Sequence, residues 1–207
     1  MPPLPEDPVD RRRDVVLAGH LGDVALARHG WADPSPPVRA AALGALHRLN
    51  VLDADTLSCA MRDPEPLVRR RACELHATRP ELGVEALAGG LADADVTVVE
   101  AACFALGELG EAGAGATSVL AVVATTHDDA LCREAAVAAL GAIGHPAGLP
   151  AILAATTDKA AVRRRAVLAL APFEGSDVDD ALQRAATDRD WQVRQAAEDL
   201  GVLPASP

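Results

Sequence analysis

Histidines and cysteines are the residues of this chain best suited to bind metals or to act as nucleophiles. The six histidines include no His-x-x-x-His pair, and the four cysteines, at positions 59, 73, 103 and 132, include no Cys-x-x-Cys pair. Structural zinc requires four ligands at short, regular spacings. The sequence therefore predicts no metal site and no cofactor, and free buried thiols in a reducing cytosol are the simplest interpretation of the cysteines.

Two of the cysteines nevertheless permit a second interpretation. Cys73 and Cys103 lie thirty residues apart at equivalent positions of a sequence repeat, and His76 follows Cys73 within one helical turn. A Cys/His cluster is conceivable there, but we favour small core residues beside a buried imidazole, because the pattern falls short of four ligands.

Motifs for catalysis are lacking elsewhere in the sequence. The chain has no G-x-S-x-G and no phosphate-binding glycine loop that opens a Rossmann unit. The glycine-rich segment 108–115 is interpreted as a lengthened loop between helices and a hinge. No catalytic residue is predicted.

Charge narrows the range of partners. The 207 residues include 19 basic and 30 acidic side chains, for a net charge of −11. Proteins that bind nucleic acids usually carry a basic surface that displaces counterions from phosphates. The composition therefore disfavours a nucleic-acid partner.

The elements that position these residues are set by an internal repeat of about 30 residues. Aligned segments place similar small apolar residues in one column, at Val38, Val68, Val98, Cys132, Val162 and Val193. Four residues later every segment has alanine, at Ala42, Ala72, Ala102, Ala136, Ala166 and Ala197. Because residues four apart share one face of a helix, these columns predict a buried helical face.

A second helix is predicted before each of these helices. The partner helices are expected over 14–29, 53–61, 81–91, 116–125, 149–156 and 177–186, with Pro80 in the first turn of the third. Alanine supplies 45 residues and aromatic residues only four, which favours closely packed helices over a β-sandwich or barrel. We expect an all-α solenoid, a right-handed superhelix of about six helix pairs over residues 14–203, a disordered segment over 1–13 and a loose tail over 204–207.

The start of the chain is rich in proline and acidic residues and does not resemble a signal peptide. No run of eighteen apolar residues is present, so no membrane span is predicted. A cytoplasmic location is therefore expected.

The repeat core D-P-x-x-x-V-R-x-x-A-x-x-A-L-G resembles the HEAT-repeat family, and most closely its short variant in phycobilisome-lyase-like proteins. Two stretches carry the resemblance best, from Asp33 to Leu46 and from Cys132 to Gly141. The resemblance implies that arginines following the first column reach aspartates at the starts of repeats, forming a structural ladder. The implied members are Asp33, Arg39, Asp63, Arg69, Asp93, Arg133, Asp158, Arg163, Asp188 and Arg194, with an interruption at Val99.

The resemblance also implies that outward positions of the second helices line a concave face. The candidate residues for binding a partner there are Arg70, Arg71, Glu74, Glu100, Phe104, Glu134, Arg164, Arg165 and Leu168. The arginines suit acidic segments, while Phe104 and Leu168 suit apolar contacts. The alternative is that Phe104 packs inward and the arginines are merely solvated.

We predict a non-catalytic scaffold or adaptor that binds a protein along this face. The alternative is an enzyme or enzyme subunit similar to the lyase-like or hydroxylase-like relatives. Related deoxyhypusine hydroxylases use repeated His-Glu pairs to hold iron, but this chain has no His-Glu dipeptide.

Overall fold

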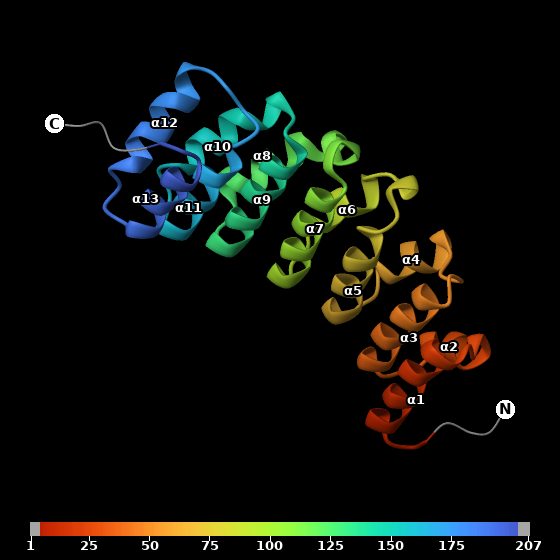
Figure 1. Ribbon diagram of the computed structural model, residues 1–207. Coiled ribbons are helices and arrows are strands. Elements are labelled where there is room, and N and C mark those ends of the chain that lie inside the picture. The colour runs from red at the N-terminus through yellow and green to blue at the C-terminus, as the bar shows by residue number, and fades with distance from the viewer. Residues whose placement is uncertain (1–4, 203–207) are drawn as a thin grey trace. The chain divides into compact units, whose positions relative to one another are not determined.

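The computed structural model describes residues 5–202, which fold into helices joined by short turns (Figure 1). The chain divides into two compact units, Met1–Leu82 and Gly83–Pro207, each of which has its own packed helices. Within the described residues, no helix is both long and apolar enough to cross a membrane.

The first unit has two layers of helices. In one layer lie α1 (Pro8–Leu21), α3 (Pro36–Arg48) and α5 (Pro66–His76), with α3 packed between its two neighbours. Helices α2 (Val24–Trp31) and α4 (Ala54–Ala60) cover α3 and α5 respectively, and the short 3-10 helix η1 (Pro80–Leu82) ends the unit. The order of these helices can be followed from red to yellow in Figure 1.

The second unit repeats this arrangement. One layer consists of α7 (Val96–Glu108), α9 (Ala130–Ile143), α11 (Ala160–Ala169) and α13 (Trp191–Asp199), each packed on the next. The other consists of α6 (Glu85–Gly90), α8 (Thr117–Thr126), α10 (Leu149–Ala155) and α12 (Ser176–Ala186). Two 3-10 helices, η2 (Gly110–Ala116) and η3 (Pro146–Gly148), lead into α8 and α10.

The core is built from the two sequence columns. All six residues of the first column and all six alanines of the second are at most 1% exposed. Helices can pack at the usual 8–10 Å only if the side chains at the contact are small, which explains the alanine at every crossing. The predicted all-α fold of paired helices is confirmed, as is the register of the repeat.

Helix starts are fixed by local side-chain chemistry. The carboxylates of Asp23 and Asp53 accept hydrogen bonds from backbone amides three residues later. These bonds satisfy amides that have no partner within the helix. Helices α1, α3 and α5 also carry proline in their first turn, where a missing N–H costs nothing.

The N-terminal region differs from the expectation. Helix α1 begins at Pro8, so residues 8–13 are helical rather than disordered. The single helix expected over 14–29 is two helices, because Gly22 ends α1 at φ +85° and Asp23 caps the start of α2. Six pairs, from α2–α3 to α12–α13, therefore follow an additional helix, α1. The expected tail over 204–207 lies outside the described residues.

Two further segments also correct the sequence interpretation. Pro80 begins the 3-10 helix η1 and not α6, which starts at Glu85. The glycine-rich segment 108–115 is not an extended loop, because most of it is the 3-10 helix η2. Gly113 packs so tightly that an added Cβ would lie 2.5 Å from the carbonyl oxygen of Leu106. The boundary between the two units falls instead between Leu82 and Gly83.

Candidate functional site

Arginines on the helices that carry the two sequence columns, and on α1, connect neighbouring repeats within each unit. In the first unit, Arg39 donates from Nε and Nη2 to the carboxylate of Asp63, at 2.9 and 2.8 Å. Its Nη1 donates to the carbonyls of Asp33 and Pro34, at the start of its own repeat. Arg11 holds Asp33 in the same way. One guanidinium thereby joins two turns through a planar, bidentate contact.

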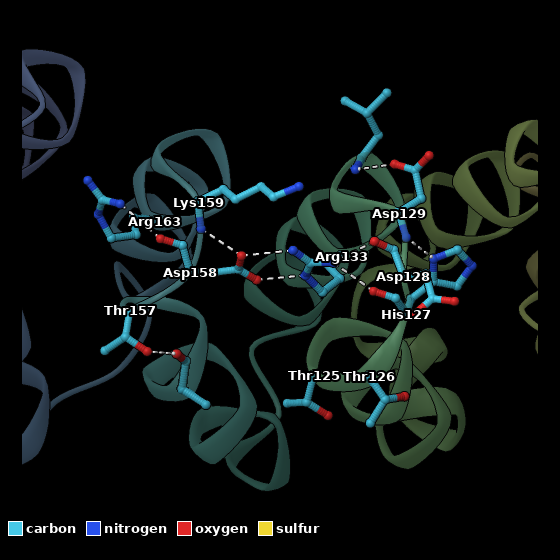
Figure 2. Close-up of polar contacts among 12 residues, drawn as sticks. Thr125, Thr126, His127, Asp128, Asp129, Arg133, Thr157, Asp158, Lys159 and Arg163 are labelled. Atoms are coloured by element: carbon cyan, nitrogen blue, oxygen red, sulfur yellow. Dashed lines mark hydrogen bonds and ion pairs between the residues drawn. The ribbon is translucent and has the colours of Figure 1, made fainter.

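The second unit contains the same connection. Arg133 donates to Asp158 at 2.6 and 2.8 Å, and its Nη1 reaches the carbonyls of His127 and Asp128 (Figure 2). Arg163 donates to Asp188 at 2.9 and 2.8 Å. We name the four pairs Arg11–Asp33, Arg39–Asp63, Arg133–Asp158 and Arg163–Asp188 the Arg–Asp ladder. Arg69 and Arg194 bind the carbonyls of Asp63 and Asp188, respectively.

The ladder is absent between α7 and α9 because both partners are replaced. Val99 takes the position of the arginine and is fully buried. His127 takes the position of the aspartate, and its Nδ1 accepts the amide of Asp129, the bond that Asp188 accepts from Asp190 (Figure 2). The predicted interruption at Val99 therefore leaves no unpaired carboxylate behind.

The pairing lowers the pKa of each ladder carboxylate. For Asp158 and Asp188 the hydrogen bonds from the arginines are the largest influence. For Asp33 and Asp63 burial is the largest single influence and acts to raise the pKa, but the arginine and backbone-amide hydrogen bonds together outweigh it.

This shift predicts acid sensitivity. An aspartate with a lowered folded pKa contributes stability above its unfolded pKa of about 3.9, and that stability is lost as the pH falls through the folded pKa. We expect Asp158→Asn to reduce the free energy of unfolding at pH 7 and to cost progressively less below about pH 4. Urea unfolding across this range measures the effect. Asp180→Asn, at an exposed site, is the control; an equal pH trend in both variants would contradict the prediction.

A groove crosses the outward face of the second unit. It encloses about 570 Å³, and residues from α7 and α9 form most of its walls. Phe104 and Leu131 are each 60% exposed there, above a floor that includes Ala138. Gly107 lets the helices approach, since an added Cβ would lie 3.2 Å from the Cα of Ala139. We name this the α7–α9 groove.

Charged groups surround the apolar floor of the α7–α9 groove. Glu100, Glu108 and Glu134 supply carboxylates, and Arg165 reaches in from α11. Arg165 forms an ion pair with Glu134 at 3.4 Å, a long contact between partly exposed groups that contributes little to stability. Two carboxylates therefore remain without an ion pair in the described structure, beside two exposed apolar side chains.

The remaining predicted residues of this unit lie apart from that cluster. Leu168 lines a neighbouring cavity of about 500 Å³ that shares Ala138, Ala142 and Arg165 with the α7–α9 groove. Leu168 is half-buried, because it also packs on the core cluster formed with α12 and α13. Arg164 lines neither cavity.

A second groove of about 500 Å³ crosses the first unit. It contains the predicted Arg70, Arg71 and Glu74, together with Arg12 and Arg48. We name it the arginine groove. Small residues form its floor, namely Ala40, Ala41 and Gly44. Apolar side chains form its sides, namely Val16, Pro37 and Leu67.

The cysteines and histidines differ in their surroundings. Burial, and then nearby Asp129 and Glu100, raise the pKa of the Cys132 thiol to about 11, so it stays protonated at neutral pH. His76 is buried as expected, whereas Cys59 is exposed rather than buried. Across residues 5–202, no three His, Cys, Asp or Glu side chains are grouped to hold a metal ion.

Comparison with known families agrees with this repeat architecture. The model of HEAT repeats matches residues 54–141 and 117–200, which together cover more than half of the chain. The chain belongs to the HEAT-repeat family. The match is to the general repeat, and the short phycobilisome-lyase-like variant is not distinguished by it. No curated protein matches this HEAT-repeat chain in sequence.

Solved structures share the HEAT-repeat fold. An engineered protein, target OR366, is 21% identical with a TM-score of 0.67 over 86% of this chain and 96% of its own. A second, target OR329, is 21% identical with a TM-score of 0.59, over 92% and 94%. The YIBA protein of Escherichia coli is 16% identical with a TM-score of 0.62, over 95% and 75%. At these identities the similarity shows the fold alone.

Sequence reasoning missed several residues of the two grooves of this HEAT-repeat chain, among them Arg12, Arg48, Glu108 and Leu131. Arg48 and Glu108 lie four residues after Gly44 and Phe104, so one more helical turn of the outward column identifies them. Arg12 follows Arg11 as Arg70 follows Arg69, but α1 was not expected to begin before residue 14. Leu131 directly precedes Cys132 of the first column, and no sequence pattern identifies that position as part of a binding surface.

Proposed function

We propose that this chain is a non-enzymatic scaffold or adaptor that binds another protein through the outward face of its second helices. The α7–α9 groove is the observation that carries the proposal. Aromatic anchors in grooves on rigid helices dominate the energetics of protein interfaces, and solenoids present such grooves along their length. A large aromatic side chain that is 60% exposed has no role in the core.

The chemistry of the groove also describes its partner. Phe104 and Leu131 suit an apolar side chain, and Glu100 and Glu108 suit basic residues on either side of it. An amphipathic helix with such a face is one of the recurrent ways in which peptides bind grooves. A cytoplasmic location is part of the proposal and is supported by four cysteines that form no disulfide.

The test compares two aromatic residues of similar exposure. Phe104 is 60% exposed within the groove, and Trp191 is 64% exposed outside it. A displayed library of helical peptides is selected against the whole chain, and Kd values of the selected peptides are measured by fluorescence anisotropy. We expect Phe104→Ala to weaken binding about 30-fold, as for a hot spot of about 2 kcal/mol.

Trp191→Ala is the matched control and should leave the same Kd values unchanged. A library that yields only peptides indifferent to Phe104→Ala would contradict the proposed function. Enrichment of acidic rather than basic sequences at this groove would contradict its assignment to a basic partner.

A further inference from the structure

The two units of the chain differ sharply in charge. Residues 1–82 contain 11 basic and 12 acidic side chains, whereas residues 83–207 contain 8 basic and 18 acidic side chains. The net charge is therefore −1 for the first unit and −10 for the second. Most of the positive charge of this acidic protein lies in the smaller unit.

Within the first unit, positive charge concentrates in the arginine groove. Arg12, Arg48, Arg70 and Arg71 line it, and Glu74 is its one acidic residue. Arg71 donates to Glu74 at 2.9 Å, and Arg70 lies 3.5 Å from the same carboxylate. Among the described residues, Arg12 and Arg48 have no hydrogen bond or ion pair. The four guanidinium groups thus share a single carboxylate.

Two of these guanidinium groups lie beside glycines of a neighbouring helix. An added Cβ at Gly19 of α1 would lie 2.9 Å from Nη1 of Arg48, and one at Gly44 of α3 would lie 2.9 Å from Nη2 of Arg71. Each arginine therefore lies against the preceding helix of the same layer, at a position where a larger residue would displace the guanidinium group. Both guanidinium groups therefore lie against a neighbouring helix while remaining accessible to solvent.

A half-buried histidine, His47, lies beside the groove and is affected by this positive charge. The pKa of His47 is lowered, first by burial and then by the nearby charges of Arg71, Arg79 and Arg48. Like charges disfavour the protonated imidazole. The charges that act on His47 are therefore those of arginines, two of which line the groove.

We infer that the arginine groove binds an acidic peptide segment of a partner protein, with carboxylates on the arginines and an apolar side chain beside Val16 and Leu67. This inference rests on the proposed function, because it assigns a ligand chemistry to one of two binding surfaces. The guanidinium fork matches a carboxylate bidentately. A volume of about 500 Å³ is within the range of ligand-binding clefts.

Charge favours a short acidic peptide over a nucleic acid. A long polyanion would extend beyond the groove and meet the field of a protein with net charge −11. At physiological salt, charges more than about 8 Å away are largely screened, so a short segment responds mainly to the local arginines. The apolar sides of the groove also suit a leucine-like side chain, which a phosphate backbone lacks.

The test uses the whole chain and a fluorescein-labelled peptide with the repeated sequence Glu-Glu-Leu. Fluorescence anisotropy at physiological salt should detect binding. We expect Arg48→Gln and Arg12→Gln each to weaken binding about tenfold, the loss expected for one charge-assisted hydrogen bond. Both side chains lack partners among the described residues, so these variants should fold normally, as circular dichroism would verify.

Arg164→Gln is the matched control, since Arg164 also lies on a second helix but outside the grooves. Unchanged affinity in Arg48→Gln and Arg12→Gln, or equal binding of a Lys-Lys-Leu peptide or single-stranded DNA, would overturn the inference. Self-association abolished by Arg48→Gln would also overturn it, by assigning the groove to a second copy of this chain. Phe104→Ala should not affect the acidic peptide, so failure here is distinguishable from failure of the proposed function.

Discussion

Replacement of Arg163 by methionine should lower the free energy of unfolding by about 2–4 kcal/mol, between the values typical of exposed and fully buried ion pairs. The Arg163 side chain is 7% exposed and that of Asp188 is 16% exposed. Methionine preserves most of the packing volume but leaves the Asp188 carboxylate without its bidentate donor. The carbonyl of Asp158 loses a donor as well.

Two measurements test this result. Urea unfolding gives the loss of stability, and amide hydrogen exchange should rise in α13, because Asp188 positions the turn before that helix. Arg164→Met is the control at the next position and should change stability by less than about 0.5 kcal/mol. Equal free energies of unfolding for the Arg163 and Arg164 variants would show that the Arg–Asp ladder does not stabilise the fold.

The natural interruption of the ladder suggests a sharper version of the experiment. Because Val99 and His127 replace both partners at one junction, the double variant Arg163→Val with Asp188→His copies an arrangement that the chain already uses. We expect the double variant to lose less stability than the sum of the two single variants. Strict additivity would argue against coupling between these side chains.

The sequence predicts most of the fold because each repeat buries the same column of small residues. The repeat pattern does not reveal the start of α1, because the positions equivalent to Val38 and Ala42 are Asp10 and Asp14. As the first helix in its layer, α1 has a neighbour within that layer on one side only, α3, and it also contacts α2. The side without a neighbour tolerates charge. A pattern search that requires buried columns therefore begins one helix too late.

The sites were predictable only in part. The outward column identifies Arg70, Arg71 and Phe104, because helical spacing fixes the face on which they lie. It does not determine that Phe104 is exposed while Leu168 packs on the adjacent core, since that depends on the neighbouring helices. Nor does the outward column predict where the guanidinium groups of Arg48 and Arg71 lie, because each lies against a glycine of a different helix.

Close approach of α9 and α11 should make Gly141 intolerant of even one methyl group. An added Cβ would lie 2.6 Å from the Cβ of Ala169 and 2.7 Å from its Cα. The Cα cannot move unless the helix moves with it. We expect Gly141→Ala to destabilise the chain by about 1–3 kcal/mol, despite the better helix propensity of alanine.

The matched control is Gly89→Ala in α6, where an added Cβ has no neighbour within 4 Å and stability should stay equal or rise slightly. Combining Gly141→Ala with Ala169→Gly removes the contact between methyl groups but not the contact with the backbone. Urea unfolding should therefore show only partial rescue in the double variant. Full rescue would mean that side chains alone set the spacing of α9 and α11, and that the helices themselves do not approach as closely as the structure indicates.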